Sequence, residues 1–93
     1  MDDLLPSEFF LSQNYPNPFC GKTSIKYCIA YKTRVILTIY NSKGKLISKL
    51  VNEEKKAGTY EIEFNSYQLT EGNYYYRLIA GEYSNVKEMK IEE

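Results

Sequence analysis

Few side chains in this sequence could do chemistry, and their spacing does not form a catalytic set. The chain has no histidine, which removes the commonest general base and the commonest metal ligand together. Its only aspartates, Asp2 and Asp3, stand beside the N-terminus, and the glutamates fall mostly on outward strand faces, so no nucleophile has a base beside it. We therefore predict no enzymatic activity, no catalytic residue and no cofactor.

The two cysteines, Cys20 and Cys28, are the remaining candidates for metal binding or redox chemistry. They lack the Cys-x-x-Cys spacing, and no histidine completes a ligand set, so a zinc or other metal site is not expected. Because Cys28 is predicted on the outward face of a strand, a disulfide would need a favourable strand pairing. The sequence leaves the state of these thiols open, with a disulfide as the less favoured alternative.

The charges do not predict binding to nucleic acid. Twelve basic and twelve acidic residues give a net charge of zero, and both signs are interleaved along the chain. The longest basic cluster is Lys55-Lys56, beside Glu53-Glu54, and it lacks the footprint of a nucleic-acid interface. No apolar run reaches the roughly 20 residues of a membrane-spanning helix. The acidic start is unlike a signal peptide, but a chain of this size can be a piece of a longer protein, so no compartment follows.

Hydrophobic alternation with a period of two residues predicts strands throughout, and no stretch shows a helical period. The ranges expected as strands are 23–29, 33–40, 45–51, 59–65, 69–80 and 84–91, after an irregular first strand. Charged residues 52–58 are expected as a turn tip, residues 66–69 as one helical turn, and Val86 as a bulge because it falls out of phase. We predict one all-β domain, an Ig-like antiparallel β-sandwich of about seven strands with Greek-key connections.

The stretch 69–80 is predicted as the central strand, with Tyr74, Tyr76 and Leu78 inward and Arg77 outward. The Tyr74 hydroxyl is expected to bond the backbone of the preceding connection, as in the tyrosine corner of Greek-key sandwiches. Structural roles in turns and core are predicted for Tyr74 and for Gly44, Gly58 and Gly72. Residues 41–44 read as a type I turn closed by Gly44.

Before the regular strands comes a segment that cannot be helical. Residues 11–19 read Leu-Ser-Gln-Asn-Tyr-Pro-Asn-Pro-Phe, and alternate prolines force extended geometry. We expect an edge strand or a wrapped ribbon, with Tyr15 and Phe19 anchored on the core. A lid over one sandwich edge is favoured over a proline-rich recognition segment, and the sequence leaves open whether the two X-Pro bonds are cis. Residues 1–8 are expected to be a linker or leader.

The order in which these motifs follow one another along the chain is similar to that of a known protein family. The chain resembles the type A C-terminal sorting domain of the type IX secretion system. The motifs that carry this resemblance are, in order, the segment 11–19, Thr23-Ser-Ile-Lys-Tyr27, residues 35–41 with Gly44, Ala57-Gly-Thr-Tyr60, and Gly72 with the following tyrosines. The chain is also similar to the Ig-like domain of the flagellar hook-capping protein. The resemblance covers about residues 9–91 and implies that residues 9–93 form this sorting domain.

The resemblance implies a non-catalytic module at the C-terminus of a larger exported protein, which passes through the periplasm to the cell surface. The implied partners are the outer-membrane secretion machinery and a sortase-like peptidase, with the isolated domain monomeric. Recognition is assigned to the ribbon and the last strand, whose expected open edge suits β-augmentation; the residues are Asn14, Tyr15, Pro16, Asn17, Pro18, Phe19, Lys87, Met89 and Lys90. The alternative is a structural or carbohydrate-binding Ig-like appendage that uses Tyr31, Tyr67, Tyr75 and Tyr83.

Overall fold

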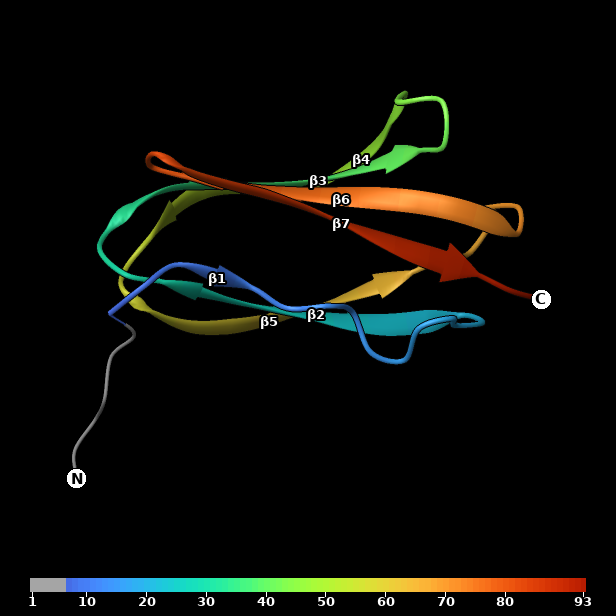
Figure 1. The fold of residues 1–93 in the computed structure, drawn as a ribbon, viewed down its shortest axis with the longest axis horizontal. Helices are drawn as coiled ribbons and strands as arrows, with labels where there is room; N and C mark the ends of the chain where they lie inside the picture. The colour runs from blue at the N-terminus through green and yellow to red at the C-terminus, as the bar shows by residue number, and fades with distance from the viewer. Residues whose placement is uncertain (1–6) are drawn as a thin grey trace.

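Two antiparallel sheets face each other in the computed structural model, which describes residues 7–93 (Figure 1). The strands are β1 (Phe10–Leu11), β2 (Lys22–Ile29), β3 (Thr33–Asn41), β4 (Leu46–Lys55), β5 (Gly58–Asn65), β6 (Gly72–Ala80) and β7 (Tyr83–Ile91). One sheet has the order β1-β2-β5 and the other β4-β3-β6-β7. The predicted sandwich of about seven strands is confirmed, while the Greek-key connectivity stays a prediction. Most of the expected linker, residues 1–8, lies outside the described residues.

The alternation of apolar residues builds the core as predicted. The central strands β2, β3 and β6 bury every second side chain along most of their length, because successive side chains of a strand point to opposite faces. The buried apolar residues of the three central strands are Ile25, Tyr27, Ile29, Val35, Leu37, Ile39, Tyr74, Tyr76, Leu78 and Ala80. β3 lies between β4 and β6, and β6 lies between β3 and β7. The expectation that 69–80 supplies a central strand is therefore confirmed.

The connections around β6 follow the sequence with one exception. The Tyr74 hydroxyl donates a 2.8 Å hydrogen bond to the carbonyl oxygen of Thr70, as expected of a tyrosine corner. Residues 66–69 form a tight turn with Gln68 at a φ of 71°, so the expected helical turn is wrong there. One backbone hydrogen bond, from Leu69 N–H to Ser66 C=O at 2.9 Å, holds this turn.

Two other expectations about the strands are wrong. β4 does not end before a charged tip at residue 52, because residues 52–55 continue to pair with β3, from Thr33 opposite Lys55 to Ile36 opposite Asn52. β7 has no bulge at Val86, because its pairing with β6 keeps one register along the whole strand. Val86 falls out of phase with Met89 only because it faces the other side of the sheet.

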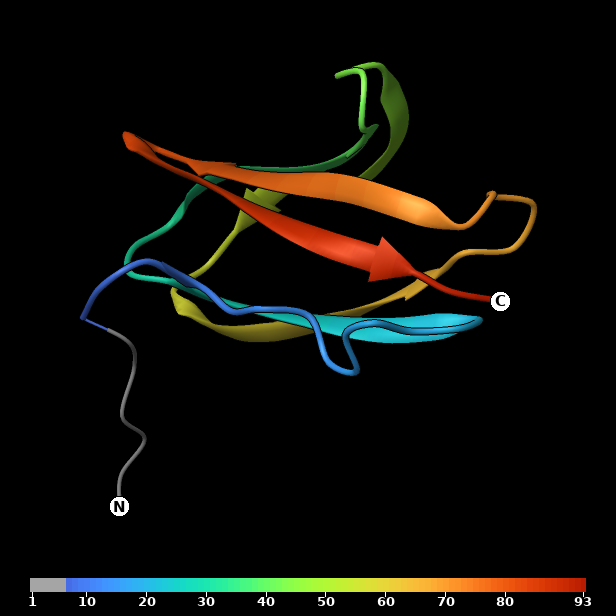
Figure 2. The same ribbon diagram turned by 45° about the vertical axis from the view of Figure 1, so that its right-hand side comes forward.

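The irregularities lie instead between β3 and β4. The register shifts twice, between Leu37 and Thr38 and between Ile39 and Tyr40, and leaves Leu50 and Ile47 of β4 without a direct partner. Bulges of this kind bend a strand and increase its twist. The β3–β4 hairpin accordingly rises away from the rest of its sheet (Figure 2). Its turn is the predicted one: Gly44 has a φ of 84°, and its N–H donates to Asn41 C=O at 2.9 Å.

Candidate functional site

The proline-containing ribbon, residues 12–19, crosses from one sheet to the other along one side of the sandwich. At its start, Ser12 N–H donates to Lys26 C=O of β2 at 3.0 Å, and Tyr15 exchanges two backbone hydrogen bonds with Ser24, each of 3.0 Å. At its end, Phe19 forms a parallel bridge with Ile91 of β7. The ribbon therefore bonds both to β2 of the three-stranded sheet and to the edge strand β7 of the four-stranded sheet.

A buried amide fixes the first half of the ribbon. The Asn14 side chain is 2% exposed. Its Nδ2 donates to Pro16 C=O at 3.1 Å and to Thr23 Oγ1 at 3.0 Å, while Thr23 Oγ1 itself donates to the same Pro16 carbonyl at 2.8 Å. Both X-Pro bonds of the ribbon, Tyr15-Pro16 and Asn17-Pro18, are cis. Buried polar groups need partners of this kind, so Asn14 has a positioning role.

The second half of the ribbon is fixed to β7. Asn17 Oδ1 accepts a hydrogen bond of 2.9 Å from Lys90 N–H, and Phe19 N–H donates to Lys90 C=O at 3.0 Å. Glu92 N–H donates to Phe19 C=O at 2.8 Å, and Gln13 Nε2 donates to Glu88 C=O at 2.6 Å. The edge of β7 at Glu88 and Lys90 is therefore occupied, and the expectation of an open edge on the last strand is wrong at these residues.

Of the two ribbon side chains that were expected to anchor the ribbon on the core, one is buried and the other is exposed. Phe19 is 3% exposed and packs edge-on against Phe64, at a ring distance of 6.3 Å, as predicted. Tyr15 is 82% exposed, so its predicted anchoring role is wrong. Because neighbouring side chains of an extended segment alternate in direction, the burial of Asn14 turns Tyr15 toward solvent. Pro16, Asn17 and Pro18 are exposed as well.

The structure brings four of the nine predicted ribbon and last-strand residues together in one groove. A groove of about 390 Å³ lies between the ribbon and β7, and Asn17, Pro18, Met89 and Lys90 are among the residues that line it. Lys90 is exposed, Lys87 is half-buried and Met89 is fully buried. Of the nine predicted recognition residues, Asn14, Phe19 and Met89 are thus buried supports, and the other six lie at the surface.

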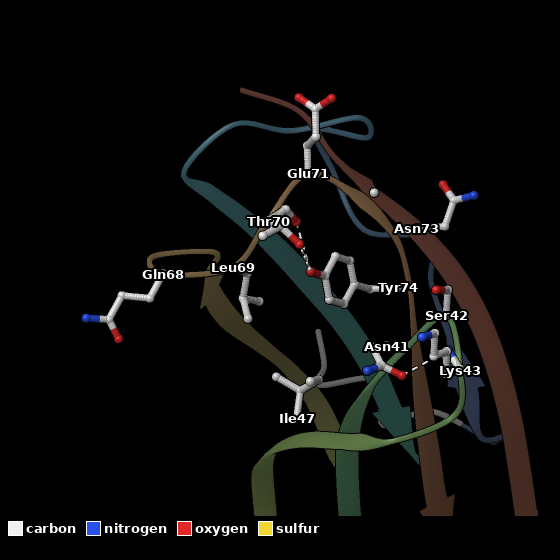
Figure 3. Close-up of a pocket in the computed structure, with 11 residues that line it drawn as sticks. Asn41, Ser42, Lys43, Ile47, Gln68, Leu69, Thr70, Glu71, Asn73 and Tyr74 are labelled. Carbon is white, nitrogen blue, oxygen red and sulfur yellow. Dashed lines mark hydrogen bonds between the residues drawn. The ribbon is translucent and has the colours of Figure 1, made fainter.

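A second concave site was not anticipated from the sequence. A cavity of about 380 Å³ lies between the raised β3–β4 hairpin and the β5–β6 connection, with Ile47 and Leu69 among its apolar lining (Figure 3). Two of its polar side chains bond within the wall: Asn41 Oδ1 accepts from Lys43 N–H at 2.9 Å, and the Tyr74 hydroxyl donates to Thr70 C=O. Ile47, one of the lining residues, lies at a bulge of β4, and regular alternation in the sequence gives no sign of that bulge.

The ribbon and the residues around it include few groups that could titrate or bind a metal. Burial raises the pKa of Tyr76 to about 12, and its hydroxyl donates a 2.6 Å hydrogen bond to Ser12 C=O at the start of the ribbon. Cys20 is exposed and Cys28 half-buried, and both are free thiols. Across residues 7–93 no three His, Cys, Asp or Glu side chains are grouped as a metal site. The same residues include no helix that could cross a membrane.

The tyrosines considered for carbohydrate binding lie in three separate places. Tyr31 and Tyr83 both pack on Phe9, with ring distances of 4.9 Å and 5.6 Å. Tyr75 is half-buried on β6, and Tyr67 is exposed in the turn after β5. The predicted turn glycines sit where the chain reverses or begins a strand: Gly44 closes the hairpin, and Gly58 and Gly72 begin β5 and β6.

Comparison with known proteins agrees with this architecture. The chain is similar in structure to dimeric latent PorU from Porphyromonas gingivalis, with a TM-score of 0.68 and 16% identity over 98% of this chain. It is also similar to PorZ, a surface component of the type IX secretion system of the same bacterium, with a TM-score of 0.61 and 14% identity over 91% of this chain. The chain spans only 10% and 11% of these two proteins. None of the curated proteins matches this sequence.

The sequence itself matches the family described as the secretion system C-terminal sorting domain over residues 13–92. This match begins inside the ribbon and ends one residue after β7, so it includes both the proline-containing part of the ribbon and the last strand. Domains of this family are non-catalytic sorting signals, which mark the C-terminus of proteins exported through the periplasm to the outer membrane or cell surface. The chain therefore belongs to the family of C-terminal sorting domains read by the type IX secretion machinery.

Proposed function

We propose that the secretion machinery recognises this domain as a folded surface formed by the ribbon and β7. Tyr15, Pro16, Asn17 and Pro18 supply one half of this surface, and Lys87 and Lys90 supply the other. The domain itself makes and breaks no bond, and it is monomeric. A sortase-like peptidase then removes it from a larger exported protein that carries it at the C-terminus.

One observation carries this proposal: the ribbon is held on β7 by hydrogen bonds that leave its proline-flanked side chains exposed. Gln13, Asn17 and Phe19 all bond the β7 backbone. A surface fixed in this way loses little conformational entropy on binding, which favours affinity. Prolines flanked by an exposed aromatic ring and cationic side chains also offer apolar contact and charge to a partner in one place.

The test is a reporter fused to residues 9–93 behind a signal peptide, in a host with type IX export. The surface variant combines Tyr15→Ala with Lys90→Glu. The matched control combines Tyr67→Ala with Lys43→Glu, which makes the same changes at exposed positions outside the ribbon and β7. We expect the unaltered and control fusions outside the cell and the surface variant held in the periplasm.

A thermal melt of each purified domain checks that both variants fold. Export of the surface variant at the level of the unaltered fusion would remove the ribbon and β7 from recognition. Retention of the unaltered fusion in the periplasm would contradict the sorting role of residues 9–93 in that host.

A further inference from the structure

The sandwich has four edge strands, and three of them are protected against pairing with another chain. Native sheets protect their edges with short strands, bulges, charges or covering segments. β1 is two residues long, and β4 carries two bulges and an exposed lysine, Lys49. The edge of β7 is covered by the ribbon, and Asn85 Oδ1 accepts from Val86 N–H at 2.8 Å.

The fourth edge, β5, is neither short, bulged nor covered by another segment, and its only charged side chains are those of Glu61 and Glu63. Its eight residues pair with β2 in one unbroken register, from Gly58 opposite Ile29 to Asn65 opposite Lys22, with no proline. Within residues 7–93 no strand lies on its other side. An edge of this length and regularity is a ready template for an added strand.

The direction of the free backbone groups follows from the pairing of β2. Ser24 and Lys26 use their backbone groups on the ribbon side, where they bond Tyr15 and Ser12. In an antiparallel ladder the bonding direction alternates along the strand. The residues opposite Ser24 and Lys26, which are Glu63 and Glu61, therefore direct their N–H and C=O groups to the open side of β5, as does Thr59.

Half-buried apolar side chains line the same side of the sandwich. Ile47 and Leu50 come from β4, and Tyr60 and Ile62 come from β5; all four pack against the core but remain partly exposed. On the opposite side the ribbon covers the gap between the sheets, whereas here the β5–β6 connection lies beside Ile47 and the Lys55 ammonium lies 5.0 Å from the Tyr60 ring, and no described strand pairs along β5. Inward side chains of an added strand would cover this apolar strip.

The charges on β5 select the kind of partner. Glu61 and Glu63 are exposed and point outward, and they alternate with Tyr60 and Ile62. The two antiparallel registers that pair the largest part of β5 with the β5 of a second copy, and that match the direction of the free backbone groups, place Glu61 opposite Glu61 or opposite Glu63, which is destabilising. We propose that the β5 edge binds an extended segment of another protein in which basic residues alternate with apolar residues. This site is independent of the proposed recognition surface on the ribbon and β7.

The test uses a short capped peptide in which lysine alternates with valine, and a twin with glutamate in place of lysine. NMR of the whole chain follows amide shifts and hydrogen-exchange protection at Thr59, Glu61 and Glu63. We expect the lysine peptide alone to protect these amides. Glu61→Pro blocks the edge without removing a bond to β2, because the Glu61 N–H faces outward; it should weaken binding by at least about tenfold, or 1.4 kcal/mol.

A second variant, Glu61→Lys with Glu63→Lys, keeps every backbone group and reverses the charge, so the preference should switch to the glutamate peptide. Equal binding of both peptides, no protection at the three amides, or unchanged affinity of Glu61→Pro would overturn the proposal. Dimers of the unaltered chain that disappear in Glu61→Pro would assign the edge to a second copy instead. None of these outcomes depends on whether the domain is exported.

Discussion

The side-chain oxygen of Asn17 accepts a hydrogen bond of 2.9 Å from the backbone N–H of Lys90, two residues that are 73 positions apart in the sequence. This bond occupies a donor on the edge of β7 and holds the exposed part of the ribbon in place. It is the most direct link between the two halves of the proposed recognition surface, so its removal should affect the ribbon without disturbing the core.

Replacing Asn17 tests this link. Asn17→Ala removes the acceptor and leaves the Lys90 N–H to solvent, and we expect a loss of about 1 kcal/mol in the free energy of unfolding. Amide exchange at Lys90 should become faster. Asn17→Asp keeps an acceptor oxygen and should retain slow exchange, so equal exchange rates in the two variants would contradict this role.

Asn14 should be far less tolerant of a single-atom change. Asn14→Asp removes the amide donors that bond Pro16 C=O and Thr23 Oγ1 and places a carboxylate in a buried site. We expect a loss of roughly 2–3 kcal/mol by chemical denaturation, because a buried polar group without its partners costs this much or more. The control is Asn73→Asp, the same change at an exposed position on β6; a similar loss in the control would assign the effect to charge alone.

The stability of the domain should fall at high pH in part through Tyr76. Its folded-state pKa is raised to about 12 by burial, while the unfolded value is 10.0, so the native state holds the proton more tightly. The contribution is fully present below pH 10.0 and is lost as the pH rises toward about 12. Tyr76→Phe should lower stability at neutral pH, because Ser12 C=O loses its donor, and should flatten the decline above pH 10.0. Parallel pH profiles for the two proteins would contradict this assignment.

Phe9 and Phe10 are neighbouring phenylalanines that allow a matched test of whether the packing of Phe9 on Tyr31 and Tyr83 stabilises the start of the fold. Phe9 packs between Tyr31 and Tyr83, while Phe10 is 55% exposed. We expect Phe9→Ala to cost about 1–2 kcal/mol, since each aromatic pair contributes up to about 1.5 kcal/mol beyond its buried area. Phe10→Ala should change the thermal midpoint little. A larger fall of the thermal midpoint in Phe10→Ala than in Phe9→Ala would contradict this stabilising role of Phe9.

The features that could be predicted from the sequence are those fixed by local pattern. Alternation placed Tyr27, Leu37 and Leu78 in the core, and Gly44 closes its turn because residue 44 requires a positive φ. The closing of one sandwich edge by the ribbon was also expected. For the alternation and the turn, the physical cause acts within a few residues along the chain; for the ribbon, only its extended geometry, which the prolines impose, has such a local cause.

The features that could not be predicted depend on contacts between distant residues. Tyr15 was expected to anchor the ribbon because an exposed aromatic pair beside prolines would form an unpaired apolar patch. Instead, Gln13, Pro16 and Thr23 all bond the Asn14 side chain, and the burial of Asn14 turns Tyr15 outward. The bulges at Ile47 and Leu50 reflect how the β3–β4 hairpin twists against the rest of the fold. The capping of the β7 edge likewise depends on Gln13 and Asn17, which no local rule connects to Glu88 and Lys90.

The parallel bridge between Phe19 and Ile91 has a consequence for synthesis. A ribosome releases residue 19 long before residue 91, and the two must meet before this side of the sandwich can close. A polypeptide that is interrupted before β7 therefore lacks the finished surface, whatever precedes it. Because of this one contact, the proposed recognition surface can form only after translation of the whole domain is completed.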